Sequence, residues 1–219
     1  MKFELIHGDC ITQMKAFKKG QFDLCLTDPP YNAKNIGKQK KVYKDSVMQL
    51  PTKQYQKFCK EWFAQAKRIS KTLVFTPGIA NICYYPQPDW VICWSKPSAV
   101  SFNRMGGFNV WEPIFVYGKC AKGKRLNRDL IMNDIMNFNK GIETQHPCPK
   151  QIGLIKKLCD IFSNKGDKII DPFMGSGTTG VAALDQYKEF TGIEKVKPYF
   201  DLTVRRIAEF QAQGKLIEV

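Results

Sequence analysis

The tetrapeptide Asp28-Pro29-Pro30-Tyr31 follows an apolar run and combines a carboxylate, a rigid turn and an aromatic ring. Two prolines cannot continue a central strand, so the turn should lie at the sheet edge where ligands bind. Asp28 and the Pro29 carbonyl could accept hydrogen bonds from the two N–H groups of an exocyclic base amine, and the fixed φ of proline aims that carbonyl in advance. Tyr31 could stack on a base rotated out of a duplex. The turn therefore predicts chemistry at an amine of a nucleobase.

A glycine-rich turn over residues 173–180 follows a strand-like run and precedes a helical one. Its backbone N–H groups and the helix N-terminus can face a polar ligand, which predicts a cofactor loop. Gly175, Gly177 and Gly180 also fit Gly-x-Gly-x-x-Gly, with Glu194 at about the distance of a ribose-binding acid. A nucleotide-binding oxidoreductase is therefore an alternative, although it gives the proline turn no role.

Apolar runs of strand length alternate with stretches of helical period, which is typical of a doubly wound α/β sheet. We expect strands at residues 3–6, 22–27, 73–76, 90–94, 114–117, 168–170 and 189–193. We expect helices at residues 11–17, 53–70 and 152–162, after the glycine-rich turn, and at 199–210. The length of 219 residues and the 43% hydrophobic content predict a single domain over residues 1–219.

The formal net charge of +14 predicts a surface that attracts polyanions, with nucleic acid as the first partner to consider. Residues 32–52 should form a mobile basic loop that orders on DNA binding, and the polar residues 118–145 an insert at the rim of the sheet. Both segments should flank the proline turn. The candidate DNA-binding residues are Lys34, Lys38, Lys40, Lys41, Lys122, Lys124, Arg125 and Arg128. For any single lysine, a solvated loop remains the alternative.

The remaining composition excludes several classes of protein. No apolar run approaches the roughly 18 residues of a membrane helix, and the N-terminus is unlike a secretory signal. The eight cysteines include no Cys-x-x-Cys pair, which favours buried free thiols over disulfides or a zinc site. We therefore expect no metal and no membrane.

The two motifs together resemble those of the DNA amino-methyltransferases. In that family Asp-Pro-Pro-Tyr is the catalytic motif and Asp-Pro-Phe-x-Gly-Ser-Gly-Thr is the S-adenosylmethionine motif, and both stand here in full at residues 28–31 and 171–178. Further segments that resemble family landmarks are residues 7–10, 94–96, 112–114 and 146–150. The catalytic motif precedes the cofactor motif, as in the β group of the family, whose target-recognition insert lies between them. Residues 118–145 occupy that position.

The resemblance implies a doubly wound, mostly parallel, Rossmann-like methyltransferase sheet with a small target-recognition insert. The residues implied to be catalytic are Asp28, Pro29, Pro30 and Tyr31. The residues implied to bind S-adenosylmethionine are Asp9, Cys10, Asp28, Pro29, His146, Phe173, Gly175, Ser176, Gly177, Thr178 and Glu194. Within this set, Asp9 would contact the adenine and Glu194 the ribose. From the residues alone, an ordinary turn aspartate and a solvated strand end fit these two positions as well, and Asp171 is interpreted as a structural carboxylate.

The implied reaction is site-specific methylation of the adenine N6 amine in DNA, by direct displacement after base flipping. Asp rather than Ser at position 28 favours adenine in this family, and cytosine N4 is the nearest alternative because both amines need the same acceptors. Gln151 stands where many relatives carry proline, which leaves open what His146 and Lys150 contact. The implied partners are double-stranded DNA, a second copy of the chain and a cognate restriction enzyme, in the cytoplasm of a prokaryotic or phage-infected cell.

Overall fold

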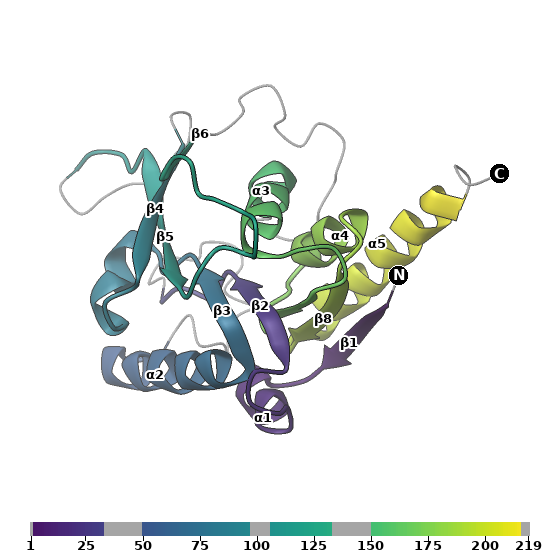
Figure 1. The fold of residues 1–219 in the computed structure, drawn as a ribbon. Helices are drawn as coiled ribbons and strands as arrows, with labels where there is room; N and C mark the ends of the chain where they lie inside the picture. The colour runs from purple at the N-terminus through teal and green to yellow at the C-terminus, as the bar shows by residue number, and fades with distance from the viewer. Residues whose placement is uncertain (1, 33–49, 97–105, 133–149, 216–219) are drawn as a thin grey trace.

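The computed structural model describes residues 2–32, 50–96, 106–132 and 150–215. The strands are β1 (Phe3–His7), β2 (Phe22–Thr27), β3 (Ser70–Phe75), β4 (Trp90–Ser95), β5 (Trp111–Tyr117), β6 (Leu130–Met132), β7 (Lys168–Asp171) and β8 (Glu189–Glu194). They form one eight-stranded sheet in the order β1-β8-β7-β2-β3-β5-β4-β6 (Figure 1). Within the described ranges, β5 runs against both of its neighbours and the other pairings are parallel.

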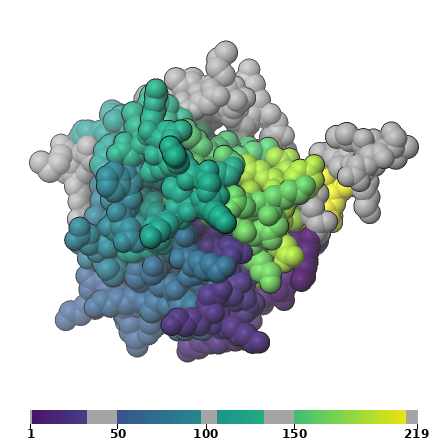
Figure 2. Space-filling view, in the orientation of Figure 1, coloured from purple at the N-terminus to yellow at the C-terminus, as the bar shows by residue number. Residues whose placement is uncertain are grey.

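Helices cover both faces of this sheet (Figure 1). The helices are α1 (Cys10–Lys15), α2 (Thr52–Ile69), α3 (Ile152–Phe162), α4 (Thr178–Asp185) and α5 (Lys197–Lys215), with a 3-10 helix η3 (Ile79–Tyr84). Helices α1 and α2 pack with one hydrophobic core, and α3, α4 and α5 with the other. In the space-filling view, purple N-terminal segments lie beside green C-terminal ones, in keeping with the pairing of β1 with β8 (Figure 2). None of the described helices is long and apolar enough to cross a membrane.

The two cores follow from the alternation of side chains along each central strand. In β2, Leu24 and Leu26 point to the α3 and α4 side, whereas Cys25 points to the α1 and α2 side. A parallel strand covered on both faces must be apolar on both, and this is why residues 22–27 read as a continuous apolar run. On α2, Tyr55 and Trp62 are fully buried two turns apart, so one stripe of the helix faces the sheet.

The connections place a crevice at the centre of the sheet. From β7 the chain crosses through α4 to β8 on one side, and from β2 it crosses through α2 to β3 on the other. Neighbouring parallel strands whose connections diverge in this way open a ligand site at their carboxyl ends. The ends of β2 and β7 carry Thr27 and Asp171, so the two motifs found in the sequence meet at this point.

The expected fold class is confirmed: the sheet is doubly wound, mostly parallel and Rossmann-like. The expected strands are all present, with ends shifted by up to three residues, whereas β6 and η3 were not predicted. Both are short, and a strand of three residues gives too little alternation to detect. Of the expected buried thiols, Cys10, Cys25, Cys59 and Cys159 are buried, but Cys83 is exposed.

Two helical glycines form a matched pair that tests the packing of α4 on the sheet. A Cβ at Gly180 would lie 2.7 Å from the Phe190 ring and 3.0 Å from Ile207, and both side chains are buried. A Cβ at Gly153 of α3 would meet no atom within 4 Å. Gly180→Ala should lower the free energy of unfolding by about 1–3 kcal/mol through overpacking. Gly153→Ala should leave it unchanged or raise it by up to about 1 kcal/mol.

Urea unfolding of both variants at one protein concentration measures this difference. Equal free energies of unfolding for the two variants would show that α4 does not pack as tightly as described.

Candidate functional site

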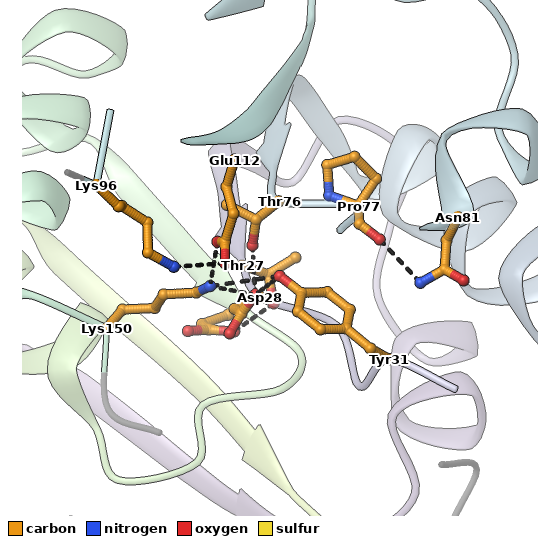
Figure 3. Close-up of polar contacts among 10 residues, drawn as sticks. Thr27, Asp28, Tyr31, Thr76, Pro77, Asn81, Lys96, Glu112 and Lys150 are labelled. Carbon is orange, nitrogen blue, oxygen red and sulfur yellow. Dashed lines mark hydrogen bonds and ion pairs between the residues drawn. The ribbon is translucent and has the colours of Figure 1, made fainter. Parts of the chain in front are cut away.

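The Asp28 carboxylate is the centre of a polar cluster at the carboxyl edge of the sheet (Figure 3). Its Oδ1 accepts a hydrogen bond of 2.5 Å from the Tyr31 hydroxyl and another from the Thr76 hydroxyl. Lys150 Nζ lies 3.1 Å from the same oxygen. The side chain of Asp28 is nevertheless 32% exposed, so the carboxylate can reach an incoming group.

The proline turn is held from α2 and from the segment after β3. The Tyr55 hydroxyl donates to the Pro30 carbonyl at 3.0 Å, which fixes the turn against the buried face of α2. The Tyr31 ring lies against Gly78, where a Cβ would approach the ring to 3.3 Å. Burial and the neighbouring Asp28 raise the pKa of Tyr31 well above its ordinary value, so its hydroxyl stays protonated and remains a donor.

Three further charged residues form a chain of ion pairs that ends on Asp28 (Figure 3). Lys150 Nζ also lies 3.1 Å from Glu112 Oε2, and Lys96 Nζ lies 2.5 Å from Glu112 Oε1. Burial would raise the pKa of Glu112, but Lys150 and Lys96 hold this pKa below its ordinary value. Burial would lower the pKa of Lys150, but Asp28, Tyr31 and Glu112 together raise it well above its ordinary value. Glu112 and Lys150 can therefore both be charged at neutral pH.

The strand directions explain why these residues meet. Thr76 follows β3 and Lys96 follows β4, so both stand at the carboxyl edge of the sheet. Glu112 lies near the start of β5, and because β5 is antiparallel its start reaches the same edge. Lys150 stands two residues before α3, the helix that leads back toward the start of β7.

Asp171 joins the two motifs across the crevice. It is 3% exposed, and its Oδ1 accepts from the Thr27 hydroxyl at 2.6 Å and from the Phe173 N–H at 3.0 Å. The bond from the Phe173 N–H is of the kind expected for a structural carboxylate that accepts loop amides.

The glycine-rich loop after β7 is closed by contacts from β8 and α5. Gly175 and Gly177 have φ of +50° and +79°, a region that favours glycine. The loop carbonyls are also held, because the Thr203 hydroxyl donates to the Gly175 carbonyl at 2.8 Å and Arg206 donates to the Ser176 carbonyl. The loop is thus fixed before any ligand arrives.

Glu194 lies beneath this loop at the end of β8. Its carboxylate accepts from the N–H of Gly175 at 3.0 Å and from the N–H of Val196 at 2.7 Å. Burial raises the pKa of Glu194. A solvated strand end is therefore the wrong description of this residue.

Asp9 follows β1 at the same edge and caps α1, accepting from the Thr12 N–H at 3.1 Å. Its side chain is 42% exposed, and Lys195 lies 3.6 Å from it, beside Glu194. Carboxylates at Asp9 and Glu194 beside a glycine loop with positive φ are suited to a ligand that carries hydroxyl and amino groups. These acceptors fit the hydroxyl and amino groups of the nucleoside and amino-acid parts of S-adenosylmethionine. The buried Cys10 begins α1 next to Asp9.

The structure separates the predicted residues into three groups. Residues 28–31, Asp9, Cys10, 173–178 and Glu194 lie at one edge of the sheet. The predicted residues Lys34, Lys38, Lys40, Lys41 and His146 fall outside the described residues. The remaining residues are Lys122, Lys124, Arg125 and Arg128, which are exposed in the segment between β5 and β6.

One expectation about this basic segment is wrong. Lys124 pairs with Asp160 at 2.8 Å, and Ala121 donates to the Ile161 carbonyl, so this part of the segment lies at the C-terminal end of α3. Lys150 precedes the other end of α3, whose 11 residues span roughly 16 Å. Lys122 and Lys124 therefore do not flank the proline turn. Because β5 is antiparallel, the chain leaves it at the opposite edge, which sequence order alone does not reveal.

The sequence marked residues 94–96, 112–114 and 146–150 as family landmarks, but it gave Lys96, Glu112 and Lys150 no defined role. It gave Thr76 and Tyr55 no role in the site. A signal was available for two of them, because Thr76 and Lys96 stand directly after apolar strand runs, where side chains reach the ligand edge. No metal-binding group of His, Cys, Asp and Glu occurs within residues 2–32, 50–96, 106–132 and 150–215.

Comparisons with known proteins place these motifs in a family context. Residues 88–205, more than half of the chain, match the model of a family described as DNA methylase, of the N6 and N4 type. The chain is 29% identical to the type II methyltransferase M2.MboI of Moraxella bovis, over 94% of this chain and 88% of that protein.

Two solved structures resemble the fold. They are M1.HpyAVI in complex with SAM, at a TM-score of 0.66 and 24% identity, and the cytosine-N4-specific PvuII DNA methyltransferase, at 0.68 and 14%. The matches cover 94% and 93% of this chain, and 98% and 86% of those chains, respectively.

The burial of Asp171 predicts a dependence of stability on pH. Burial raises the pKa of Asp171 from its ordinary 3.8 to about 6, so the folded protein holds this proton more tightly than the unfolded chain. The stability that Asp171 contributes is then present below pH 3.8 and is lost as the pH rises from 3.8 through about 6. The free energy of unfolding of the wild type minus that of Asp171→Asn should fall by about 2 kcal/mol between about pH 4 and pH 7.

Guanidinium unfolding of both proteins at steps between pH 4 and pH 7 gives this difference, and groups common to both proteins cancel. A difference that is flat, or that rises with pH, would contradict the assignment.

Proposed function

The chain belongs to the DNA methylase family of N6 and N4 amino-methyltransferases, and from this premise we propose that it methylates the N6 amine of adenine in double-stranded DNA. S-adenosylmethionine is the methyl donor of this family. We further propose that transfer is a direct displacement at a base that has been flipped out of the duplex. Asp28 and the Pro29 carbonyl are the groups that contact the reacting amine.

The proposal is supported by the hydrogen bonds that residues 28–31 already accept. Oδ1 of Asp28 accepts from Tyr31 and Thr76 and pairs with Lys150, and the Pro30 carbonyl accepts from Tyr55. Among the described residues, no donor contacts Asp28 Oδ2 or the Pro29 carbonyl. We propose that these two acceptors receive the two N–H groups of an exocyclic amine.

This pair of acceptors matches what an amine needs in order to attack. The nitrogen lone pair is delocalised into the base ring, so the amine is a weak nucleophile until its N–H groups are drawn out of the ring plane. Two fixed acceptors favour that geometry at no cost of reorganisation during the reaction. The N–H hydrogen bond to Asp28 also stabilises the positive charge that develops on the nitrogen.

The residues that would hold the cofactor surround this turn. Asp9 would contact the adenine, Glu194 the ribose hydroxyls, and residues 173–178 the methionine part, with Cys10 beside Asp9. His146 belongs to the same proposed set. When bound, S-adenosylmethionine supplies an electrophilic methyl group. The chain orients this group by fixing the glycine loop through Thr203 and Arg206.

Cytosine N4 is the second candidate, and one observation favours it. The cytosine-N4-specific PvuII enzyme shares the fold at a TM-score of 0.68. Both amines would use the same two acceptors. The preference for adenine rests on Asp rather than Ser at position 28.

For DNA binding, we propose the exposed Arg125 and Arg128 together with the insert over residues 118–145 and the basic residues of the 32–52 loop. Lys122 and Lys124 would then contact phosphates away from the reacting base, since they lie at the far end of α3. A cognate restriction enzyme and a second copy of the chain are the further proposed partners.

Identification of the product tests the choice of base. Genomic DNA from a methylation-free host is incubated with the protein and methyl-tritiated S-adenosylmethionine, then digested to nucleosides and separated. The label should appear in N6-methyldeoxyadenosine. Label in N4-methyldeoxycytidine alone would overturn the adenine proposal, and label in 5-methyldeoxycytidine would overturn the role of the turn as well.

Removal of the Asp28 carboxylate tests the proposed chemistry. Asp28→Ala should lower kcat for methyl transfer by at least about 100-fold, because it removes one of the two fixed acceptors. Asp185→Ala is the matched control: it removes a carboxylate that pairs with Lys156 on the surface of α4. The control should transfer methyl groups at the wild-type rate. A wild-type rate in Asp28→Ala would sink the mechanism.

A further inference from the structure

The ion-pair chain behind Asp28 is more extensive than binding of an amine alone requires. Lys150 contributes one ammonium group to Asp28 Oδ1, Glu112 Oε2 and the Tyr31 hydroxyl, at 3.1, 3.1 and 3.3 Å. Its side chain is 15% exposed, and that of Glu112 is 19% exposed. Removing charges from water in this way is unfavourable unless the geometry of their pairing is good.

We propose that Lys150, Glu112 and Lys96 are positioning residues for methyl transfer, which lock the Asp28 carboxylate so that Oδ2 faces the target amine. The proposal rests on the proposed function and deepens it. Lys150 acts through Asp28, Glu112 acts through Lys150, and Lys96 acts through Glu112. None of the three touches the reacting atoms.

The first step of the lock is saturation of one carboxylate oxygen. A carboxylate can rotate and exchange its two oxygens unless one is held more firmly than the other. Two hydroxyl donors and one ammonium group converge on Oδ1, from Tyr31, Thr76 and Lys150. Of the three donors only Lys150 carries a full positive charge, so it makes the largest electrostatic contribution to this preference.

The second step is restraint of Lys150 itself. A lysine has a flexible stem and three donors, so a single contact would not hold its ammonium group in one place. Glu112 Oε2 gives this ammonium group a second carboxylate partner, and Lys96 holds the other oxygen of Glu112. Both ammonium groups also lie near the Trp94 ring, at 5.3 Å for Lys150 and 4.5 Å for Lys96.

The third step is the consequence for catalysis. A misplacement of about 1 Å in a reacting group can cost about 100-fold in rate. Loss of the lock should therefore lower kcat while substrate and cofactor still bind. An ion-pair chain that served only to stabilise the fold would change the melting temperature and leave kcat of the folded protein unchanged.

Chemical rescue of Lys150→Ala tests the proposal. This variant should lower kcat by about 100-fold and leave KM for S-adenosylmethionine within about threefold of the wild type. n-Propylammonium replaces the atoms that the substitution removes, and it should restore kcat at least about tenfold with a saturable dose response. 1-Propanol has a similar shape without the charge and should restore nothing. Lys71→Ala is the control, since Lys71 pairs with Asp23 on the surface.

A kcat for Lys150→Ala within about threefold of the wild type, or a folded variant that n-propylammonium does not rescue, would overturn the proposal. If Lys150→Ala does not fold, Glu112→Gln tests the proposal instead. This substitution keeps the shape of the Glu112 side chain and removes only its negative charge. It should lower kcat about tenfold without a change in KM, and an unchanged kcat refutes the lock.

For all these variants, kcat is measured by counting tritium transferred to total DNA, whichever base carries it. A failure of the adenine proposal therefore leaves the test of the lock intact. Wild-type protein that labels no DNA would refute the proposed function itself, and this result is distinct from an unchanged kcat in the variants.

Discussion

One oxygen of the Asp28 carboxylate accepts from the Tyr31 and Thr76 hydroxyls and pairs with Lys150. This convergence is the constraint on which the site depends, because it occupies one carboxylate oxygen and leaves the second oxygen to accept from the proposed target amine. The donors come from the turn itself, from the end of β3 and from the start of α3. The sheet order and the reversed direction of β5 are thus as necessary to the site as the tetrapeptide.

The same edge of the sheet also explains how cofactor and amine are brought together. The β7 and β8 half contributes the glycine loop and Glu194, and the β2 and β3 half contributes the proline turn. The hydrogen bond of 2.6 Å between Thr27 and Asp171 fixes the two halves to each other across the crevice. A methyl group held by the first half can therefore face an amine held by the second, which direct displacement requires.

Local patterns in the sequence predicted the fold and the places of the proline turn and the glycine-rich loop within it. The double proline predicted the end of β2, and the glycine spacing predicted the loop before α4. The chain from Lys96 through Glu112 to Lys150 could not be predicted in this way, because it depends on the direction of β5 and on where α3 begins. The same reversal of β5 carries Lys122 and Lys124 away from the turn, although the sequence suggested that they flank it. Contacts between distant segments were the part that periodicity could not supply.

The central claim is that Asp28 Oδ2 and the Pro29 carbonyl receive the two N–H groups of the target amine. A crystal structure of the protein with target DNA and a cofactor analogue that cannot transfer a methyl group tests this claim most directly. We expect the exocyclic nitrogen to lie within hydrogen-bond distance of both acceptors. Tyr31, Thr76 and Lys150 should still contact Oδ1, and the flipped base should lie against the Tyr31 ring. An amine that displaces Lys150 from Oδ1, or that contacts neither acceptor, would contradict it.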